Sequence, residues 1–528
     1  VHNNIFNIKD ELIYSVGRHK ITGGVTYEYQ MADNQYMRNG TGYYRYSSVD
    51  DFINGAAPEV VCLTYGYGGE TEPAARVTFN KAGIYAQDEW NATQRFKLTY
   101  GLRLDGLFFV NSDLMTNQAI YDLDYNGRHI DTGKWPKAQI TASPRIGFNW
   151  DILGNKTLKL RGGTGLFAGR LPLVFFTNMP TNSGMVQYQA QINSKNASER
   201  GFTMNEFAGG LVTDQNGKPT IAALKEKLIG LGYPENITPE QGTVPSSISA
   251  VDSKFKMPQV WKTSLAVDYQ LPVDFPFTVT AEGIVNKVVN DVTISDWSMT
   301  DTKGYTRWNG ADSRPIYPET FRAPGNKQAF VLENTHKGYG WSANLTVKMR
   351  PWDFMSFMAS YTHSVKKELT SMPGSNAESA FTYVPTISGP NNINLHNAIN
   401  TTPDRFIATL TGHDKSNKFR FASEDDKTRF MDYVHGNSYL KNHQGEYAEA
   451  YSLYSPWVHR VDISYKHDFK IKARKSMNTL QLGFDLKNLL NLFNSSWGVS
   501  KYMNSKLNEG RILKYERTDA EGYPVFST

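Results

Sequence analysis

Apolar and polar residues alternate over long stretches of this chain, which is the period of a β-strand with two different faces. In residues 261–271 one face carries Trp, Thr, Leu, Val, Tyr and Leu, and the other carries Lys, Ser, Ala, Asp and Gln. Residues 145–152, 341–350 and 480–487 alternate in the same way. This period fits a soluble sandwich, whose polar face meets water, and also a large barrel, whose polar face lines a wet lumen.

Short turns and long connections also alternate along the chain. The predicted hairpins are Asn4–Val16 with His19–Met37, Ala82–Asn91 with Arg95–Phe109, Ser143–Leu153 with Leu158–Gly169, Trp261–Leu271 with Phe277–Val289, Gly338–Arg350 with Met355–Glu368, Arg405–His413 with Lys418–Ala422, and Val458–Lys470 with Thr479–Leu490. Short turns on one side and long loops on the other are typical of outer-membrane barrels. We therefore predict an all-β fold, an antiparallel transmembrane β-barrel with about 14 strands present. The longest loop, 171–260, is expected to be extracellular and to serve as a lid or binding loop.

Composition favours the barrel over the sandwich. No stretch approaches the roughly 18 consecutive apolar residues that a transmembrane helix needs. Aromatic residues make up 13% of the chain, with 30 Tyr and 10 Trp, which suits the aromatic belts of a barrel at the membrane surfaces. The belt candidates, for which ordinary core packing is the alternative, are Trp90, Trp150, Trp261, Trp341, Trp352 and Trp457.

Charge and cysteine content exclude several partners. The net charge is +5 from 56 basic and 51 acidic residues, a balance that argues against nucleic acid, and the basic stretch Lys470–Lys475 is expected to be a hairpin turn. Cys62 is the single cysteine, so an internal disulfide and a structural cysteine–zinc site are excluded. Basic residues on the polar strand faces, such as Arg103, Arg145, Arg161 and Lys262, are expected to pair with lumen acids or with polypeptide that fills the barrel.

Both ends of the chain lead us to expect a partial barrel over residues 1–528. Val1 comes without an initiator Met or signal peptide, and Thr528 follows a polar loop instead of a final amphipathic strand. An open sheet would leave two unpaired edges in lipid, which is not tolerated. We therefore expect that residues of the barrel are missing at both ends of this sequence.

Several motifs resemble those of TonB-dependent outer-membrane receptors. Residues 85–90 (YAQDEW) followed by 98–105 (LTYGLRLD) resemble a hairpin of this family, and 484–494 (FDLKNLLNLFN) resembles its penultimate strand. More narrowly, 143–151 with 161–170, 266–272, and 445–449 with 496–499 resemble the Oar-like branch found in Bacteroidetes and some Proteobacteria. Ala450-Tyr451 departs from the Arg-Asn that this branch often has there.

The resemblance implies a plugged barrel of roughly 22 strands in the outer membrane of a Gram-negative bacterium. It therefore implies that an N-terminal plug, the first strands and the last strand are absent from residues 1–528. It implies transport of a solute bound at the extracellular loops, energised by the TonB system through the N-terminal region. The solute is left open among a peptide, a glycan and a metal chelate, and a surface lipoprotein is a possible further partner, as in the related starch-utilisation-type transporters. A passive porin, a surface adhesin and a soluble multi-domain β protein remain alternatives.

No motif indicates catalysis, a cofactor or a resident metal. Residues 161–165 (RGGTG) are rich in glycine but lack the ending of a phosphate-binding loop and read as a strand with small residues. The histidines are scattered, and no nucleophile motif is present. Acidic pairs such as Asp50-Asp51, and the run Glu424–Asp426, leave loop calcium open, with solvated loop charge as the alternative.

Aromatic and amide side chains in the loops are the candidates for substrate binding. Flat rings stack on sugar faces or cover peptide side chains, and an amide offers both donors and acceptors. Long loops also need small cores of their own, so packing is the alternative for each ring. The candidate residues are Tyr43, Tyr44, Trp297, Trp308 and Asn392.

Overall fold

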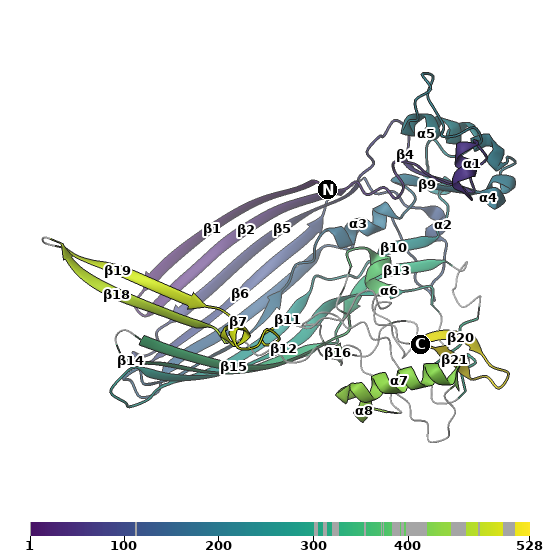
Figure 1. Cartoon of the computed structure of the whole chain (residues 1–528). Helices are drawn as coiled ribbons and strands as arrows, with labels where there is room; N and C mark the ends of the chain where they lie inside the picture. The colour runs from purple at the N-terminus through teal and green to yellow at the C-terminus, as the bar shows by residue number, and fades with distance from the viewer. Residues whose placement is uncertain are drawn as a thin grey trace.

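The computed structural model describes residues 2–110, 113–299, 305–309, 314–318, 327–352, 355–370, 372, 374–382, 391, 395–397, 420–444, 461–473, 476–499 and 513–528. Its main feature is a curved antiparallel sheet of long strands, with helices and short strands gathered at one end (Figure 1). None of its helices, in these ranges, has the length and apolar character needed to cross a membrane.

The long strands lie side by side in the order in which they occur along the chain. They are β1 (His2–Val16), β2 (His19–Asn34), β5 (Ala75–Trp90), β6 (Phe96–Phe109), β7 (Gln139–Asp151), β8 (Leu158–Ala168), β11 (Gln259–Gln270), β12 (Phe277–Asp296), β14 (Tyr339–Trp352) and β15 (Met355–Glu368). The short β16 (His396–Asn397) pairs with the end of β15. The first five predicted hairpins are confirmed, because each pair of strands is antiparallel across the predicted turn.

The outer face of the sheet is apolar and exposed, as a lipid-facing surface must be. Val25, Ile84 and Leu104 are cross-strand neighbours on this face, and each keeps more than a third of its surface exposed. Leu265 and Leu345 continue the apolar band on later strands. In water such a surface would drive aggregation, so the band identifies the side that meets the membrane.

Exposed tryptophans lie near both ends of the long strands. Trp90, Trp150 and Trp352 lie at the short-turn end, whereas Trp261 and Trp341 lie near the loop end. The Trp90 ring stacks on the His19 ring with 5.7 Å between the ring centroids. These positions fit two aromatic belts, while the sixth belt candidate, Trp457, lies outside the described residues.

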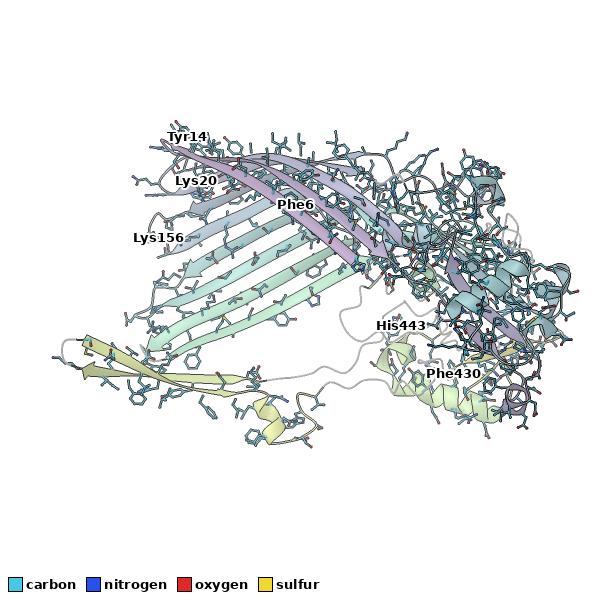
Figure 2. The ribbon with its side chains drawn as sticks, turned by 90° about the horizontal axis from the view of Figure 1, so that it is seen from above. Phe6, Tyr14, Lys20, Lys156, Phe430 and His443 are labelled. Atoms are coloured by element: carbon cyan, nitrogen blue, oxygen red, sulfur yellow. The ribbon has the colours of Figure 1, made fainter. Side chains whose placement is uncertain are left out.

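The short turns and the long loops lie at opposite ends of the sheet. Lys20 and Lys156 mark the short-turn end, whereas Phe430 and His443 lie toward the other end (Figure 2). The turn before β8 contains Gly154, whose φ of +77° is readily adopted by glycine. This asymmetry is the one that the turn and loop lengths predict.

Two loops combine into a folded module above the loop end of the sheet (Figure 1). The loop after β2 supplies β3 (Tyr43–Arg45), α1 (Val49–Ile53) and β4 (Val60–Gly66), and the loop after β8 supplies the rest of the module. The two loops join where β4 pairs antiparallel with β9. The remaining elements are β9 (Gln187–Asn193), α4 (Ser194–Glu199), η1 (Met204–Phe207), α5 (Ile221–Gly230) and η2 (Pro239–Gln241).

A buried apolar cluster holds this module together. Every residue of β4 is buried, and Leu63 and Ile192 are fully enclosed. Leu228 of α5 and Phe207 of η1 pack against the same cluster. Burying a side chain such as Leu63 contributes about 2 kcal/mol, so the loops carry a core of their own and do not depend on the barrel alone for their shape.

Further elements pack between the module and the sheet. The extension of β12 pairs antiparallel with β13 (Gln328–Thr335), and β13 pairs in parallel with β10 (Ser247–Val251). Phe176, Phe255 and Phe330 are fully buried in the cluster that joins these strands to the barrel mouth. The helices here are α2 (Gln118–Tyr121), α3 (Val174–Thr181) and α6 (Ala377–Thr382).

The C-terminal part of the chain departs from the predicted strands in one place. The predicted strand Lys418–Ala422 is described only from residue 420, where β17 (Arg420–Phe421) pairs in parallel with β21 in a small separate sheet. Its residues therefore do not form a barrel hairpin, and the proposed partner Arg405–His413 lies outside the described residues.

The other C-terminal elements include one more predicted hairpin. β18 (Ile463–Ala473) and β19 (Ser476–Leu486) pair antiparallel, as expected. They form a separate two-stranded sheet, whereas ten long strands belong to the 13-stranded main sheet. The remaining elements are α7 (Glu424–Gly436), α8 (Ser438–Asn442), η3 (Leu489–Leu492), β20 (Lys514–Thr518) and β21 (Pro524–Ser527).

Candidate solute site

A cavity of about 440 Å³ lies on the inner face of the sheet at its loop end. Its wall comes from the inward-facing residues of β2, β5 and β6, including Ala32, Phe79 and Leu107. Its other side comes from residues 169–174, the segment that follows β8 and leads into α3. We call this segment, Gly169–Val174, the strap, because it lies across the inner wall.

One ion pair anchors the strap to the wall. Arg170 Nη2 donates to Glu28 Oε2 at 2.6 Å, and the Glu28 side chain is only 10% exposed. Leu171 and Leu173 of the strap face the apolar part of the same cavity. The pair therefore fixes the strap at a position where its apolar side chains close off the loop end of the inner wall.

The floor of this cavity is charged but balanced. Asp105, whose side chain is 5% exposed, accepts hydrogen bonds from Arg103 at 2.7–2.8 Å, and Lys81 Nζ lies 3.7 Å from it. Further down the wall Arg161 pairs with Asp268 and Glu282. The expected pairing of lumen cations with lumen acids is thus confirmed at Arg103 and Arg161.

A second cavity, of about 460 Å³, lies lower on the same face. Tyr85 crosses its wall and donates a hydrogen bond to Glu11, which also pairs with Lys9 at 2.8 Å. The Arg103 guanidinium lies 5.4 Å from the centroid of the Tyr85 ring. Gly24 faces Tyr85 and leaves room for it, because a Cβ at this position would come within 2.6 Å of Tyr85 Cζ.

The motif residues 85–90 and 98–105 lie on adjacent strands of this wall. Tyr85 is paired with Arg103, and Gly83 with Asp105, in the β5–β6 register. The motif thus supplies inward-facing polar residues of both cavities. The Gly-rich stretch 161–165 is, as predicted, part of a strand, β8.

The predicted binding residues Tyr43 and Tyr44 lie together in the two-loop module. Tyr43 is exposed on β3, where a passing solute can reach it. Tyr44 packs against the module core, and its hydroxyl accepts a weak hydrogen bond from the backbone N–H of Val212 at 3.4 Å. Burial raises the pKa of Tyr44, so its phenol stays protonated at neutral pH.

The predicted residue Trp297 is a packing residue in this structure. It is 7% exposed, and its indole N–H donates to Glu333 at 3.1 Å. The Arg128 guanidinium covers the ring at 4.0 Å from its centroid, and Tyr125 meets its edge. With both a face and the N–H engaged, the ring holds loops together and offers no open surface for stacking.

Trp308 packs against the C-terminal strands. It stacks on Tyr515 with 5.2 Å between ring centroids and meets the edge of Phe526. Asn392 lies outside the described residues, although its neighbour Asn391 exchanges hydrogen bonds with the backbone of Asp296.

The acidic runs lie at the N-termini of helices. Asp50 and Asp51 lie in the first turn of α1, and residues 424–426 lie in the first turn of α7. The Ser423 hydroxyl and the backbone N–H of Thr528 hold the pKa of Asp426 well below its usual range. Across the described ranges no cluster of three or more His, Cys, Asp or Glu side chains is arranged to hold a metal.

Sequence reasoning missed the residues that form the upper cavity. Glu28 and Arg170 lie 142 positions apart, so no local pattern joins them. A weak signal exists nonetheless: Leu171-Pro172-Leu173 is an apolar run directly after a barrel strand. In water such a run needs a surface to cover, and the nearest one is the inner wall of the same sheet.

The comparison with protein families identifies the class. The sequence matches the outer membrane beta barrel domain family over residues 1–413, which is most of the chain. The chain therefore belongs to this family, and it is an outer-membrane protein. No curated protein matches its sequence.

Solved outer-membrane transporters are among the similar structures. The outer membrane transporter YddB from Escherichia coli is 12% identical, with a TM-score of 0.36, over 69% of this chain and 33% of that one. The copper transporter OprC is 12% identical, with a TM-score of 0.34, over 69% of this chain and 38% of that one. A mutant of the ferric enterobactin receptor PfeA from Pseudomonas aeruginosa is 11% identical, with a TM-score of 0.33, over 72% of this chain and 37% of that one. The chain thus spans about a third of the length of these proteins.

Proposed function

We propose that the chain is the barrel portion of a TonB-dependent outer-membrane transporter of the Oar-like branch. The observation that carries this proposal is the roofed cavity on the inner wall. Loops that fold back over the wall and anchor there by Arg170–Glu28 suit a barrel that admits a bound solute in a controlled way. A passive pore, in contrast, conducts best when no loop covers its entrance.

The resemblance at the motif residues supports the same proposal. Residues 85–90 and 98–105 resemble a receptor hairpin, and the structure places their inward-facing side chains in the two cavities. The wall charges are mutually neutralised at Arg103 and Arg161, which suits a filled lumen better than an ion-selective pore. The function proposed is binding of a solute at the extracellular loops and its energy-coupled passage through a plugged barrel, without chemical change.

The proposal includes partners. Coupling would run through an N-terminal region that contacts the TonB system. The outer lipid-facing band contacts the membrane, and the two-loop module offers a platform on which a surface lipoprotein could sit. The solute is a peptide, a glycan or a metal chelate.

Planar-bilayer recording of the full-length protein tests this proposal against a passive porin. A plugged transporter should show no steady conductance, whereas a porin of this size conducts continuously. A pull-down with the C-terminal domain of TonB from the same bacterium supplies the second measurement. Steady open channels together with no TonB binding would refute the proposed function, and a passive porin or an adhesin barrel would take its place.

A further inference from the structure

The lower cavity on the inner wall contains a cation without an acidic partner. Arg145 on β7 lines the cavity, and its guanidinium lies 4.4 Å from the centroid of the Phe167 ring. Among the described residues it forms no ion pair. Two other cations of the cavity are already neutralised, since Lys9 pairs with Glu11 and Arg103 pairs with Asp105.

A second cation that has no ion pair among the described residues lies near the same ring. Lys262 on β11 places its Nζ 5.7 Å from the centroid of Phe167. Both Arg145 and Lys262 are register partners of Gly165 on the strand between them, and no ion pair of Lys262 occurs in the described part of the chain. Because Gly165 has no side chain, the inner face between the two cations is occupied there only by the nearby Phe167 ring.

A buried hydroxyl at the same cavity also lacks a partner. Ser143 is 2% exposed and lines the cavity, and its Oγ has no hydrogen-bond partner among the described residues. A buried hydroxyl without a partner costs about 1–3 kcal/mol. An acceptor that enters the cavity would remove this cost.

We propose that this cavity binds a carboxylate of a small solute, with Arg145 as the recognition residue. The guanidinium presents a planar pair of donors that matches a carboxylate. The Ser143 hydroxyl adds a third donor, and Lys262 strengthens the positive potential. The volume of about 460 Å³ suits a small molecule. This inference rests on the proposed function, because it places a carboxylate on the solute that passes along this wall.

A phosphate group fits the cavity less well. Phosphate sites usually add backbone N–H groups to their cations, and the backbone N–H groups of β6, β7 and β8 are used in the sheet. One unpaired guanidinium with one distant ammonium matches the smaller charge of a carboxylate.

Calorimetric titration of the full-length protein in detergent at low salt tests the site. Glutarate, a small dicarboxylate, is the probe, with uncharged glutaramide and inorganic phosphate as comparisons. We expect glutarate to bind and glutaramide not to bind. Arg145→Gln should weaken binding at least about tenfold, the expected effect of losing charge-assisted hydrogen bonds. Lys262→Gln should weaken it by a smaller factor.

The matched control is Lys195→Gln, which removes one exposed positive charge from α4 in the two-loop module. It should leave glutarate affinity unchanged. Arg145→Lys keeps the positive charge but loses the planar pair of guanidinium donors, so we expect an intermediate affinity for glutarate. Migration of unheated samples on gels shows that each variant has folded.

Three results would overturn the proposal. They are no glutarate binding to the folded wild type, equal affinity in Arg145→Gln, and stronger binding of phosphate than of glutarate. If glutarate fails to bind while Arg145→Gln lowers thermal stability, the cations belong to polypeptide in the lumen. Steady bilayer conductance with normal glutarate binding would instead refute only the transporter function and leave the site in place.

Discussion

At the scale of single residues, the alternating pattern tells which way a side chain points but not what it meets. Trp297 shows the difference. Its place in a long loop suggested a stacking surface, yet Arg128 and Glu333 occupy its face and its N–H. These partners lie far away in sequence, and an aromatic ring in a loop looks the same in the sequence whether it is open or covered.

The Arg170–Glu28 pair gives a prediction at this scale. In Arg170→Gln the strap loses its anchor, so the cavity behind it should open more often. A cysteine at Ala32, which lines the cavity and is 6% exposed, should then react faster with a membrane-impermeant maleimide. An increase of roughly two- to fivefold corresponds to the usual worth of a partly exposed ion pair.

A second ion pair of β2, formed with β5, provides the control. Arg76 donates two hydrogen bonds to Asp33 at 2.7 and 3.0 Å, and Asp33 is the neighbour of Ala32 on the opposite face of β2. Arg76→Gln should leave the labelling rate at Ala32→Cys nearly unchanged. Equal acceleration by both variants would mean general loosening of the barrel mouth and not release of the strap.

At the scale of elements, the hairpins follow from the sequence and the loop module does not. Each hairpin joins neighbours across a short turn, so turn residues and period two determine it. The β4–β9 pair joins strands of seven residues each from two different loops. Strands of this length are common in soluble folds too, and nothing local selects the partner.

The core of the two-loop module can be tested separately from the barrel. Leu63→Ala removes a fully buried side chain from β4 and should cost about 2–5 kcal/mol. Because the barrel has its own hydrogen-bonded sheet, the loss should fall on the module. We expect faster cleavage of the loops by protease on whole cells, with unchanged migration of the unheated barrel on gels.

The control for this variant is Leu211→Ala in the other loop of the same module, where the side chain is 41% exposed. It removes the same atoms with little change in buried area and should leave cleavage at the wild-type rate. A Leu63→Ala barrel that no longer assembles would show that the module and the barrel fold as one cooperative unit.

At the scale of the whole molecule, the structure identifies which face of the sheet meets lipid. Leu265 and Ser264 are adjacent on β11 and point to opposite faces, with Leu265 52% exposed on the outer one. Arginine at Leu265 should cost about 2–4 kcal/mol if the site lies near the membrane midplane. Arginine at Ser264 faces Gly163 across the wet inner side and should cost much less.

Urea unfolding of both variants in lipid vesicles measures this difference. Equal costs for Leu265→Arg and Ser264→Arg would argue against a lipid-facing outer surface. Period two and the aromatic strand ends predicted this surface, whereas the family was predicted from the resemblance of residues 85–90, 98–105 and 484–494 to known motifs. The count of strands was harder, because the segment 418–422 has the composition of a strand and pairs elsewhere at its end.

The joining of two loops through β4 and β9 has a consequence for how this surface can vary between strains. β4 has β3 from its own loop on one edge and β9 from the other loop on the other edge. A recombination event that imports only one of the loops would separate partners that were selected together. Antigenic change at this surface is therefore expected to proceed by joint replacement of both loops, and antibodies against the folded surface should contact residues of each.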